Sequence, residues 1–200
     1  MICVRRARPG DAAAIGAVHV ATWRNVYAGV LPDDYLSGLS PVRHAAGYEQ
    51  AISDRRRGHA MFVAVASGAD APPGRPPGEG GGAVVGFVSG GRARRPGLCG
   101  ESPSGGGEVE TLYLLDDYRD RGLGRRLMRA MAAHLAAVGC RSVVLWVLSD
   151  NPTKWFYQRL GGRAAARESI GFAGRQVEQV AYLWDPIDVL LTATATAPER

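Results

Sequence analysis

An arginine and two glycines, just before a helix-like segment, form the part of the chain best suited to binding an anion. Arg119, Gly122 and Gly124 follow the spacing R-x-x-G-x-G, after the apolar run of residues 109–115 and before an amphipathic stretch. Glycine allows a tight turn that points successive backbone N–H groups at one place. The first turn of a helix adds unpaired N–H donors and the positive end of its dipole. This arrangement predicts a binding site for a pyrophosphate.

Two other phosphate-binding patterns are excluded by the residues present. A Walker loop requires G-x-x-x-x-G-K-[ST], which the chain does not contain. The dinucleotide-binding pattern requires a third glycine or an alanine, and an acidic residue about 20 positions further on. Leu127 occupies the third glycine position, and residues 141–144 contain no carboxylate. The interpretation that remains is a pyrophosphate loop of a different kind.

The segments around this turn predict a strand, a helix and a second strand. Residues 127–138 place apolar side chains at helical spacing, and Gly139 is suited to end that helix. Residues 142–148 form an apolar run without alternation, which is typical of a strand buried on both faces. A strand–helix–strand succession takes a right-handed crossover, so the two strands are expected to be parallel neighbours.

The rest of the chain is expected to add strands and helices around this pair. Strands are expected near residues 2–6, 60–66, 83–90, 163–171 and 176–184, and helices near 11–26, 32–39, 41–56 and 152–160. Residues 67–82, rich in Gly and Pro, are expected to form a flexible loop. Residues 187–200 are expected to be a frayed C-terminal tail, so that residues 1–186 form one domain.

Three motifs in a fixed order resemble the GNAT superfamily of N-acetyltransferases. They are HVATWRNVYAGVLPDDYL (residues 19–36), R-x-x-G-x-G, and SDNPTKWFYQRLGG (residues 149–162), and the resemblance extends over residues 2–186. It implies an α/β fold with a mixed, twisted sheet of about seven strands and four helices. Its central parallel strands are splayed apart to hold acetyl-CoA. The implied activity is transfer of the acetyl group to a primary amine. A longer acyl-CoA, or a regulatory module that binds acyl-CoA without catalysis, remains open.

The resemblance also assigns residues to the cofactor, and it implies no metal. The strand before the turn would pair with the pantetheine arm, the turn would hold the pyrophosphate, and Asp150 or Asn151 would add a further contact. The residues so assigned are Leu112, Tyr113, Leu114, Arg119, Asp120, Arg121, Gly122, Leu123, Gly124, Arg125 and Asn151.

Acetyl transfer to an amine needs a base for the amine proton and an acid for the departing thiolate. A phenol with a pKa near 10 stays protonated at neutral pH and can protonate a thiolate whose thiol has a pKa of about 8.5. The resemblance assigns this role to Tyr157. Glu108 and Glu110 are two positions apart on a strand and therefore point to one face. Either one remains a candidate base, acting directly or through water.

The acceptor amine is not identified by the sequence. The resemblance places acceptor specificity near residues 23–36, where Trp23, Tyr27 and Tyr35 are candidates to line the pocket or to belong to the core. An antibiotic amine, a polyamine, an amino acid and a protein N-terminus all remain open, as does a homodimer.

Composition and charge favour a soluble cytoplasmic enzyme. The chain has 200 residues, of which 46% are hydrophobic and 22% charged, and no apolar run approaches the ~18 residues of a membrane span. The net charge of +5 is carried almost entirely by arginine. The short clusters Arg55–Arg57 and Arg92–Arg95 indicate solvated surface rather than a nucleic-acid site. Cys3, Cys99 and Cys140 have neither disulfide nor zinc spacing.

Overall fold

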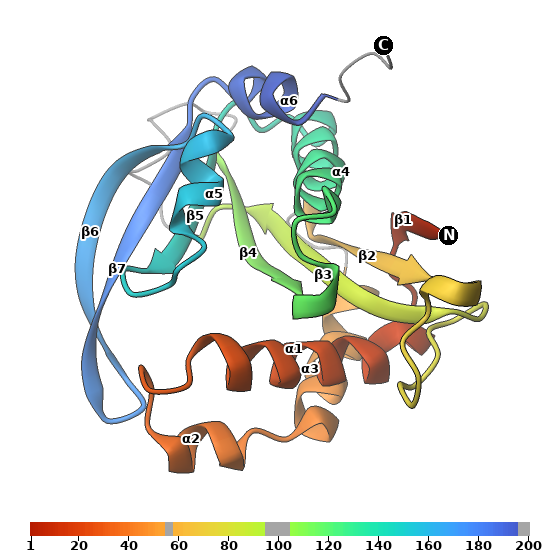
Figure 1. Ribbon diagram of the computed structural model, residues 1–200. Helices are drawn as coiled ribbons and strands as arrows, with labels where there is room; N and C mark the ends of the chain where they lie inside the picture. The colour runs from red at the N-terminus through yellow and green to blue at the C-terminus, as the bar shows by residue number, and fades with distance from the viewer. Residues whose placement is uncertain (55–57, 95–104, 196–200) are drawn as a thin grey trace.

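Seven strands form one open, twisted sheet in the computed structural model, which describes residues 1–54, 58–94 and 105–195 (Figure 1). The order across the sheet is β1-β2-β3-β4-β5-β7-β6, and β4–β5 is its parallel pair. The bounds are β1 Ile2–Arg6, β2 Ala60–Ala66, β3 Ala83–Arg92, β4 Gly107–Leu114, β5 Val143–Leu148, β6 Arg163–Phe172 and β7 Arg175–Trp184. The expected mixed sheet with a central parallel pair is confirmed.

Helices cover both faces of this sheet. Within the described residues there are six, not the four that we expected: α1 Ala12–Val26, α2 Asp33–Gly38, α3 Pro41–Ser53, α4 Leu123–Ala137, α5 Lys154–Arg159 and α6 Asp188–Thr194. Figure 1 shows α1 and α3 on one face and α4 on the opposite face. None of the helices in the described ranges is long and apolar enough to cross a membrane. Arg55–Arg57, Arg95 and Cys99 lie outside those ranges.

Helix α4 connects the two parallel strands and follows the predicted periodicity closely. Leu127, Met128, Met131 and Leu135 are completely buried against the sheet because they share one side of the helix. Gly139 follows the helix with a φ of +90°, a conformation that glycine adopts without steric cost. The helix therefore fixes the position of the turn that precedes it.

The C-terminal segment differs from the frayed tail that we expected over residues 187–200. Residues Asp188–Thr194 form α6, which packs against α4 with Leu190 completely buried. A hydrogen bond of 3.0 Å from Arg129 Nη1 to the Leu191 carbonyl oxygen joins the two helices. A helix this short has little stability alone, so the packing of α6 on α4 provides the stability that its local helix propensity lacks. Residues 196–200 lie outside the described part of the chain.

The Gly- and Pro-rich segment 67–82, which we expected to be a flexible loop, contacts the domain near both of its ends. Near its start, Asp70 pairs with the N-terminal ammonium of Met1 at 2.6 Å and with Arg121 at 3.0 Å. Near its end, the backbone N–H of Glu79 donates to Asp11 Oδ1 at 2.8 Å.

Asp11 precedes α1 as predicted, but its carboxylate binds other partners than the helix end. It is completely buried and accepts hydrogen bonds from Arg5 at 2.7 and 2.9 Å and from the backbone N–H of Arg8 and Glu79. Burial alone would raise the pKa of Asp11, but these hydrogen bonds hold it below its ordinary value of 3.8. Asp11 therefore ties β1, the start of α1 and the loop 67–82 together.

We expect Asp11→Asn to lower the free energy of unfolding by about 2 kcal/mol or more near neutral pH, because Arg5 loses its buried counter-ion. Since the folded-state pKa is depressed, the stabilisation is complete above the unfolded pKa and disappears as the pH falls through the folded pKa. Urea unfolding of both proteins at neutral pH and near pH 3 measures this. If the two proteins differ by the same free energy of unfolding at both pH values, the stabilising role of the ionised Asp11 is contradicted.

Candidate active site

The two central strands separate halfway along their length. β4 and β5 pair only at Gly107–Val143, Glu108–Val144 and Val109–Leu145. Beyond this point β4 continues along β3, and β5 continues along β7. The register between β3 and β4 shifts here, because Ser89 pairs with Thr111 and Gly90 with Val109. Glu110 is therefore the extra residue of a β-bulge, and bulges bend a strand away from its neighbour.

Gly90 is required at this bulge by the close approach of the two strands. A Cβ atom at this position would lie 2.4 Å from the carbonyl oxygen of Glu108. Because no larger residue fits there without a shift of the backbone, Gly90 allows the bulge and, with it, the separation of β4 from β5. The backbone groups of Leu112–Leu114 that would have met β5 face a cleft instead.

The turn before α4 has the geometry that the glycine pattern predicts. Gly122 has a φ of +73° and Asp120 a φ of +56°. The first helical hydrogen bond runs from the Arg126 N–H to the Gly122 carbonyl, so the N–H groups of Leu123, Gly124 and Arg125 precede the ladder. Gly124 has a packing role, since a Cβ there would lie 3.2 Å from Phe156 Cζ. These N–H groups, at the positive end of a buried helix, can bind a phosphate.

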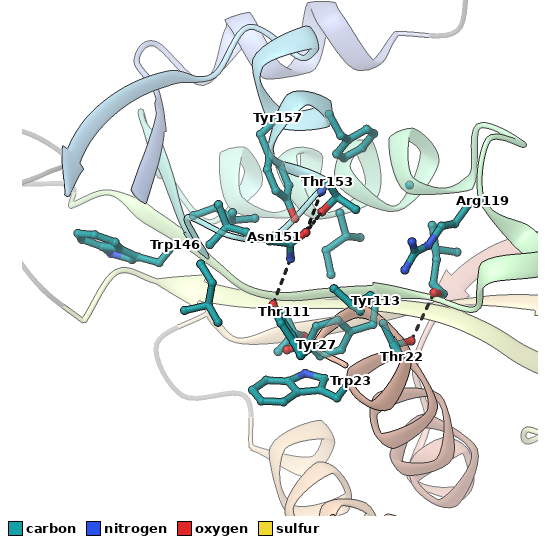
Figure 2. A pocket seen from close by; sticks show the side chains of 18 of the residues that line it. Thr22, Trp23, Tyr27, Thr111, Tyr113, Arg119, Trp146, Asn151, Thr153 and Tyr157 are labelled. Carbon is teal, nitrogen blue, oxygen red and sulfur yellow. Dashed lines mark hydrogen bonds between the residues drawn. The ribbon is translucent and has the colours of Figure 1, made fainter. Parts of the chain in front are cut away.

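A pocket of about 470 Å³ begins at this turn and follows the cleft between the separated strands. It is lined by most of the residues that the sequence nominated: Trp23, Tyr27, Glu110, Leu112, Tyr113, Leu114, Arg119, Asp120, Gly122, Leu123, Gly124, Arg125, Asn151 and Tyr157. Figure 2 shows Trp23, from α1, and Tyr27, which directly follows α1, on one side of the pocket and Tyr157, from α5, on the other. The pocket thus joins the anion-binding turn to the candidate catalytic side chains.

Tyr157 lies in the wall of this pocket and is almost entirely buried, with 5% of its surface exposed. Burial is the main cause that raises the pKa of Tyr157 well above its ordinary value, so that the phenol is protonated at neutral pH. Asn151, also buried, is oriented by its own contacts. Its Oδ1 accepts hydrogen bonds from the N–H and hydroxyl of Thr153, and its Nδ2 donates to the Tyr27 hydroxyl at 3.1 Å.

Glu110 and Glu108 differ in their access to the pocket. Glu110, in the bulge, lines both this pocket and a second cavity of about 410 Å³ beside His59 and Arg94. Its carboxylate lies 3.2 Å from His59 Nε2 and accepts a hydrogen bond from Arg94 Nη2 at 2.9 Å. The pKa of Glu110 is lowered chiefly by the hydrogen bond from His59, against the effect of burial, and Arg94 adds to the lowering. Glu108 still has strand neighbours on both sides and does not line the pocket.

Two further nominated residues also lie outside the pocket lining. Arg121 turns away from the cleft to pair with Asp70, and its guanidinium lies 5.4 Å from the centre of the Tyr118 ring. Tyr35 packs its ring against Trp23 and Phe172, at centroid distances of 6.3 and 5.3 Å.

Several lining residues were not nominated from the sequence. They include Thr22, Val26, Thr111, Trp146, Phe156, Ile170, Phe172 and Gln179. Most of these residues lie on strands β5 to β7 or on helix faces. The sequence pattern of those elements indicates only packing in the core. Phe156, one position before Tyr157 in the third motif, is the one that the motif could have indicated.

Fold and site together define an architecture in which an open cleft between two parallel strands ends at a glycine turn. A family model described as FR47-like protein matches residues 84–170, which include this cleft. The N-acetyltransferase YuaI of Bacillus subtilis (strain 168), itself uncharacterized, is 29% identical over 195 residues, covering 96% of this chain and 98% of the relative.

Solved structures share the fold at low sequence identity. An N-acetyltransferase from Staphylococcus aureus Mu50 matches with a TM-score of 0.65 and 18% identity, over 92% of this chain and 98% of its own. PaiA N-acetyltransferase from Thermoplasma acidophilum, solved in complex with coenzyme A, matches with a TM-score of 0.61 and 14% identity, over 90% and 98%. The chain therefore shares the fold of these N-acetyltransferases, and its sequence is similar to the FR47-like family model and to YuaI. In the described ranges, no three His, Cys, Asp or Glu side chains gather to hold a metal.

Proposed function

We propose that this chain transfers the acetyl group of acetyl-CoA to a primary amine by direct attack, with Glu110 as the base and Tyr157 as the acid. The observation that carries the proposal is the single pocket that connects the N–H groups before α4 with Glu110 and Tyr157. The coenzyme A bound to the neighbour PaiA supports the same use of the fold here.

The first role of the cleft is to position the cofactor. The N–H groups of Leu123, Gly124 and Arg125, together with Arg119, would hold the pyrophosphate at one end. The backbone edge of residues 112–114 that does not pair with β5 would pair with the amide groups of the pantetheine arm, as a neighbouring strand would. On this edge the Leu114 carbonyl oxygen already accepts a hydrogen bond from Thr22 Oγ1 at 3.3 Å. Holding the thioester in one place beside the amine replaces an encounter in solution by an intramolecular step.

The proton transfers balance across the two catalytic groups. Glu110 takes a proton from the amine as its nitrogen bonds to the thioester carbonyl carbon. The carbon–sulfur bond then breaks with its electron pair on sulfur, and Tyr157 gives its phenolic proton to that sulfur, yielding the amide and the free thiol. Glu110 then releases its proton to solvent and the phenolate of Tyr157 takes one up, so both groups return to their starting states before the next turnover.

Thiol release from acetyl-CoA, measured with and without a mixture of primary amines, tests the proposed function. We expect amine-dependent release, together with an increase in the melting temperature on addition of acetyl-CoA alone, because a ligand that binds only the folded state stabilises it. No stabilisation by acetyl-CoA would contradict the cofactor site. Stabilisation without release for any amine would favour a module that binds acyl-CoA without catalysis.

Gly122→Ala tests the anion-binding turn. The added Cβ meets no atom within 4 Å, but alanine at a φ of +73° is strained by roughly 1–2 kcal/mol. Relief of this strain would rotate the neighbouring N–H groups away from the phosphates, so we expect the Kd for CoA to rise about tenfold in calorimetry. The matched control is Gly29→Ala, which has a φ of +75° and equally open space outside the pocket lining. The proposal fails here if both variants bind CoA like the wild type.

A further inference from the structure

The end of the pocket away from the anion-binding turn has an apolar and aromatic wall. Trp23 and Val26 of α1, with Tyr27 directly after the helix, form one part of it, and Ile170 and Phe172 of β6 form another. Figure 1 shows the turn between β6 and β7 extending toward the segment that joins α1 and α2, so the wall combines two distant parts of the chain.

Contacts between aromatic rings from these two parts of the chain hold the wall in a fixed arrangement. The rings of Trp23 and Phe172 have centroids 5.7 Å apart, and those of Trp23 and Tyr27 lie edge to face at 5.0 Å. Tyr35 packs behind Phe172 at 5.3 Å, again edge to face. Rings held in such a cluster keep their faces and edges in fixed places, and a further ring can pack on them with little loss of conformational freedom.

The charges along the pocket are distributed unevenly. Its arginine residues, Arg119 and Arg125, belong to the turn and to α4, and Figure 2 shows Arg119 at the opposite end from Trp146. Among the described lining residues near the aromatic wall, Glu110 alone is ionisable as an acid, and no arginine or lysine lines that end; Arg94 and His59 contact the Glu110 carboxylate from the second cavity. Glu168 does not line the pocket, and its carboxylate accepts a hydrogen bond from Gln179 at 2.6 Å.

These charges restrict the acceptor chemically. A carboxylate on the acceptor would lie against aromatic rings with no cation of its own, because Arg94 is already paired with Glu110. A second ammonium group would lie there without its own carboxylate. Either arrangement is costly, because an unpaired charge loses its hydration without compensation. A single ammonium group, in contrast, finds Glu110 and the nearby aromatic faces, which attract cations.

We infer that the acceptor is an arylalkylamine, a primary amine on a short alkyl chain that ends in an aromatic ring and bears no carboxylate. This inference rests on the proposed acetyl transfer and deepens it by naming the acceptor class. The aromatic ring packs against Trp23 and Phe172, and the amino group faces Glu110. The apolar wall favours an acceptor with an aromatic ring, and the single carboxylate favours an acceptor with one ammonium group.

A panel of matched amines tests this inference by thiol release from acetyl-CoA. Phenethylamine and tryptamine are compared with phenylalanine and tryptophan, which add only a carboxylate, with spermidine, which adds ammonium groups, and with hexylamine, which lacks the ring. A short peptide with an N-terminal phenylalanine completes the panel. We expect kcat/KM for each arylalkylamine to exceed that for its amino acid by about 100-fold or more, the scale of an unpaired buried charge.

Phe172→Arg, at the edge of the wall, tests the cause of this selectivity. The substitution places a cation at a wall that has none. We therefore expect kcat/KM to fall for phenethylamine and to rise for phenylalanine, so that the ratio of the two values decreases about tenfold or more. The KM for acetyl-CoA should not change. Phe62→Arg, on β2 beside His134 and outside the pocket lining, is the control that adds the same charge elsewhere and should leave the ratio unaltered.

The outcomes separate this inference from the proposed function. If spermidine, an amino acid or the peptide is the best acceptor, the acceptor class is wrong while acetyl transfer stands. Equal rates for phenethylamine and hexylamine would show that the aromatic wall does not select a ring, and would also overturn the inference. If acetyl-CoA binds and no amine in the panel reacts, the acceptor class is again wrong. If acetyl-CoA itself does not bind, the proposed function fails first.

Discussion

Tyr157→Phe should lower kcat by about 100-fold or more and leave the Kd for acetyl-CoA unchanged. The variant loses one hydroxyl group from a side chain that is 5% exposed and packs against Tyr182 and Trp184. Since phenylalanine has the same ring, the fold and the shape of the pocket should be retained. What disappears is the proton that the proposed mechanism delivers to the thiolate.

The burial of Tyr157 keeps its phenol protonated until the thiolate forms. Its raised pKa keeps the phenol protonated over the whole neutral range, and the proton leaves only when a thiolate forms beside it. The loss should therefore occur in kcat and not in the KM for acetyl-CoA, because the interaction exists only as the bond to sulfur breaks.

Pre-steady-state thiol release with a reactive amine measures this effect on the chemical step itself. Tyr182→Phe is the matched control, because Tyr182 is a buried neighbour of Tyr157 that does not line the pocket. We expect turnover of the control within a few-fold of the wild type. A Tyr157→Phe variant that reacts as fast as the wild type would rule out the role of general acid and leave Tyr157 as a packing residue.

Glu110→Gln should lower kcat/KM by about 10²–10⁴-fold, the usual range for loss of a positioned base. Glutamine keeps the size of the side chain and can still hydrogen-bond to its neighbours, but it cannot accept the amine proton. Glu108→Gln is the matched control, since Glu108 is on the same strand and outside the pocket lining. A larger effect at Glu108 would move the base to that residue and contradict our assignment.

The partners of Glu110 also predict the pH dependence of the reaction. Its pKa is depressed below the ordinary value of 4.5, first by the hydrogen bond from His59, so the carboxylate remains ionised until the pH falls through this lowered value. The acidic limb of log kcat/KM against pH should therefore lie below 4.5 in the wild type. In His59→Gln the largest cause of the depression is removed, and the limb should move upward toward the ordinary value. An unchanged limb would show that Glu110 is not the group that titrates.

Most elements of the fold follow from local patterns that the sequence displays. The alternation and apolar runs of the strands, the helical spacing of residues 127–138 and the glycines of the turn are properties of short segments. The parallel pairing of β4 with β5 also follows, since a strand, a helix and a strand in succession are connected in one hand. For the same reason the turn and Tyr157 could be nominated as site residues.

The choice between the two glutamates was decided by the tertiary structure. Glu108 and Glu110 have the same alternation and the same chemistry in the sequence. They differ because the bulge lies at Glu110, and its place depends on the register with β3 and on the space left by Gly90. The register depends on two strands that are separate in the chain, so it cannot be predicted from the residues of β4 alone.

The sequence by itself determined the mixed α/β fold and the place of the anion-binding turn, because the glycine turn, the strand–helix–strand order and the motif set are local and ordered along the chain. Only the tertiary structure decided where the central strands part, that α6 forms on α4, and that Phe172 meets Trp23 to wall the acceptor end. The physical reason is that these features depend on contacts between residues far apart in the chain. A short helix or a single aromatic side chain carries no local signal of the partner that will cover it.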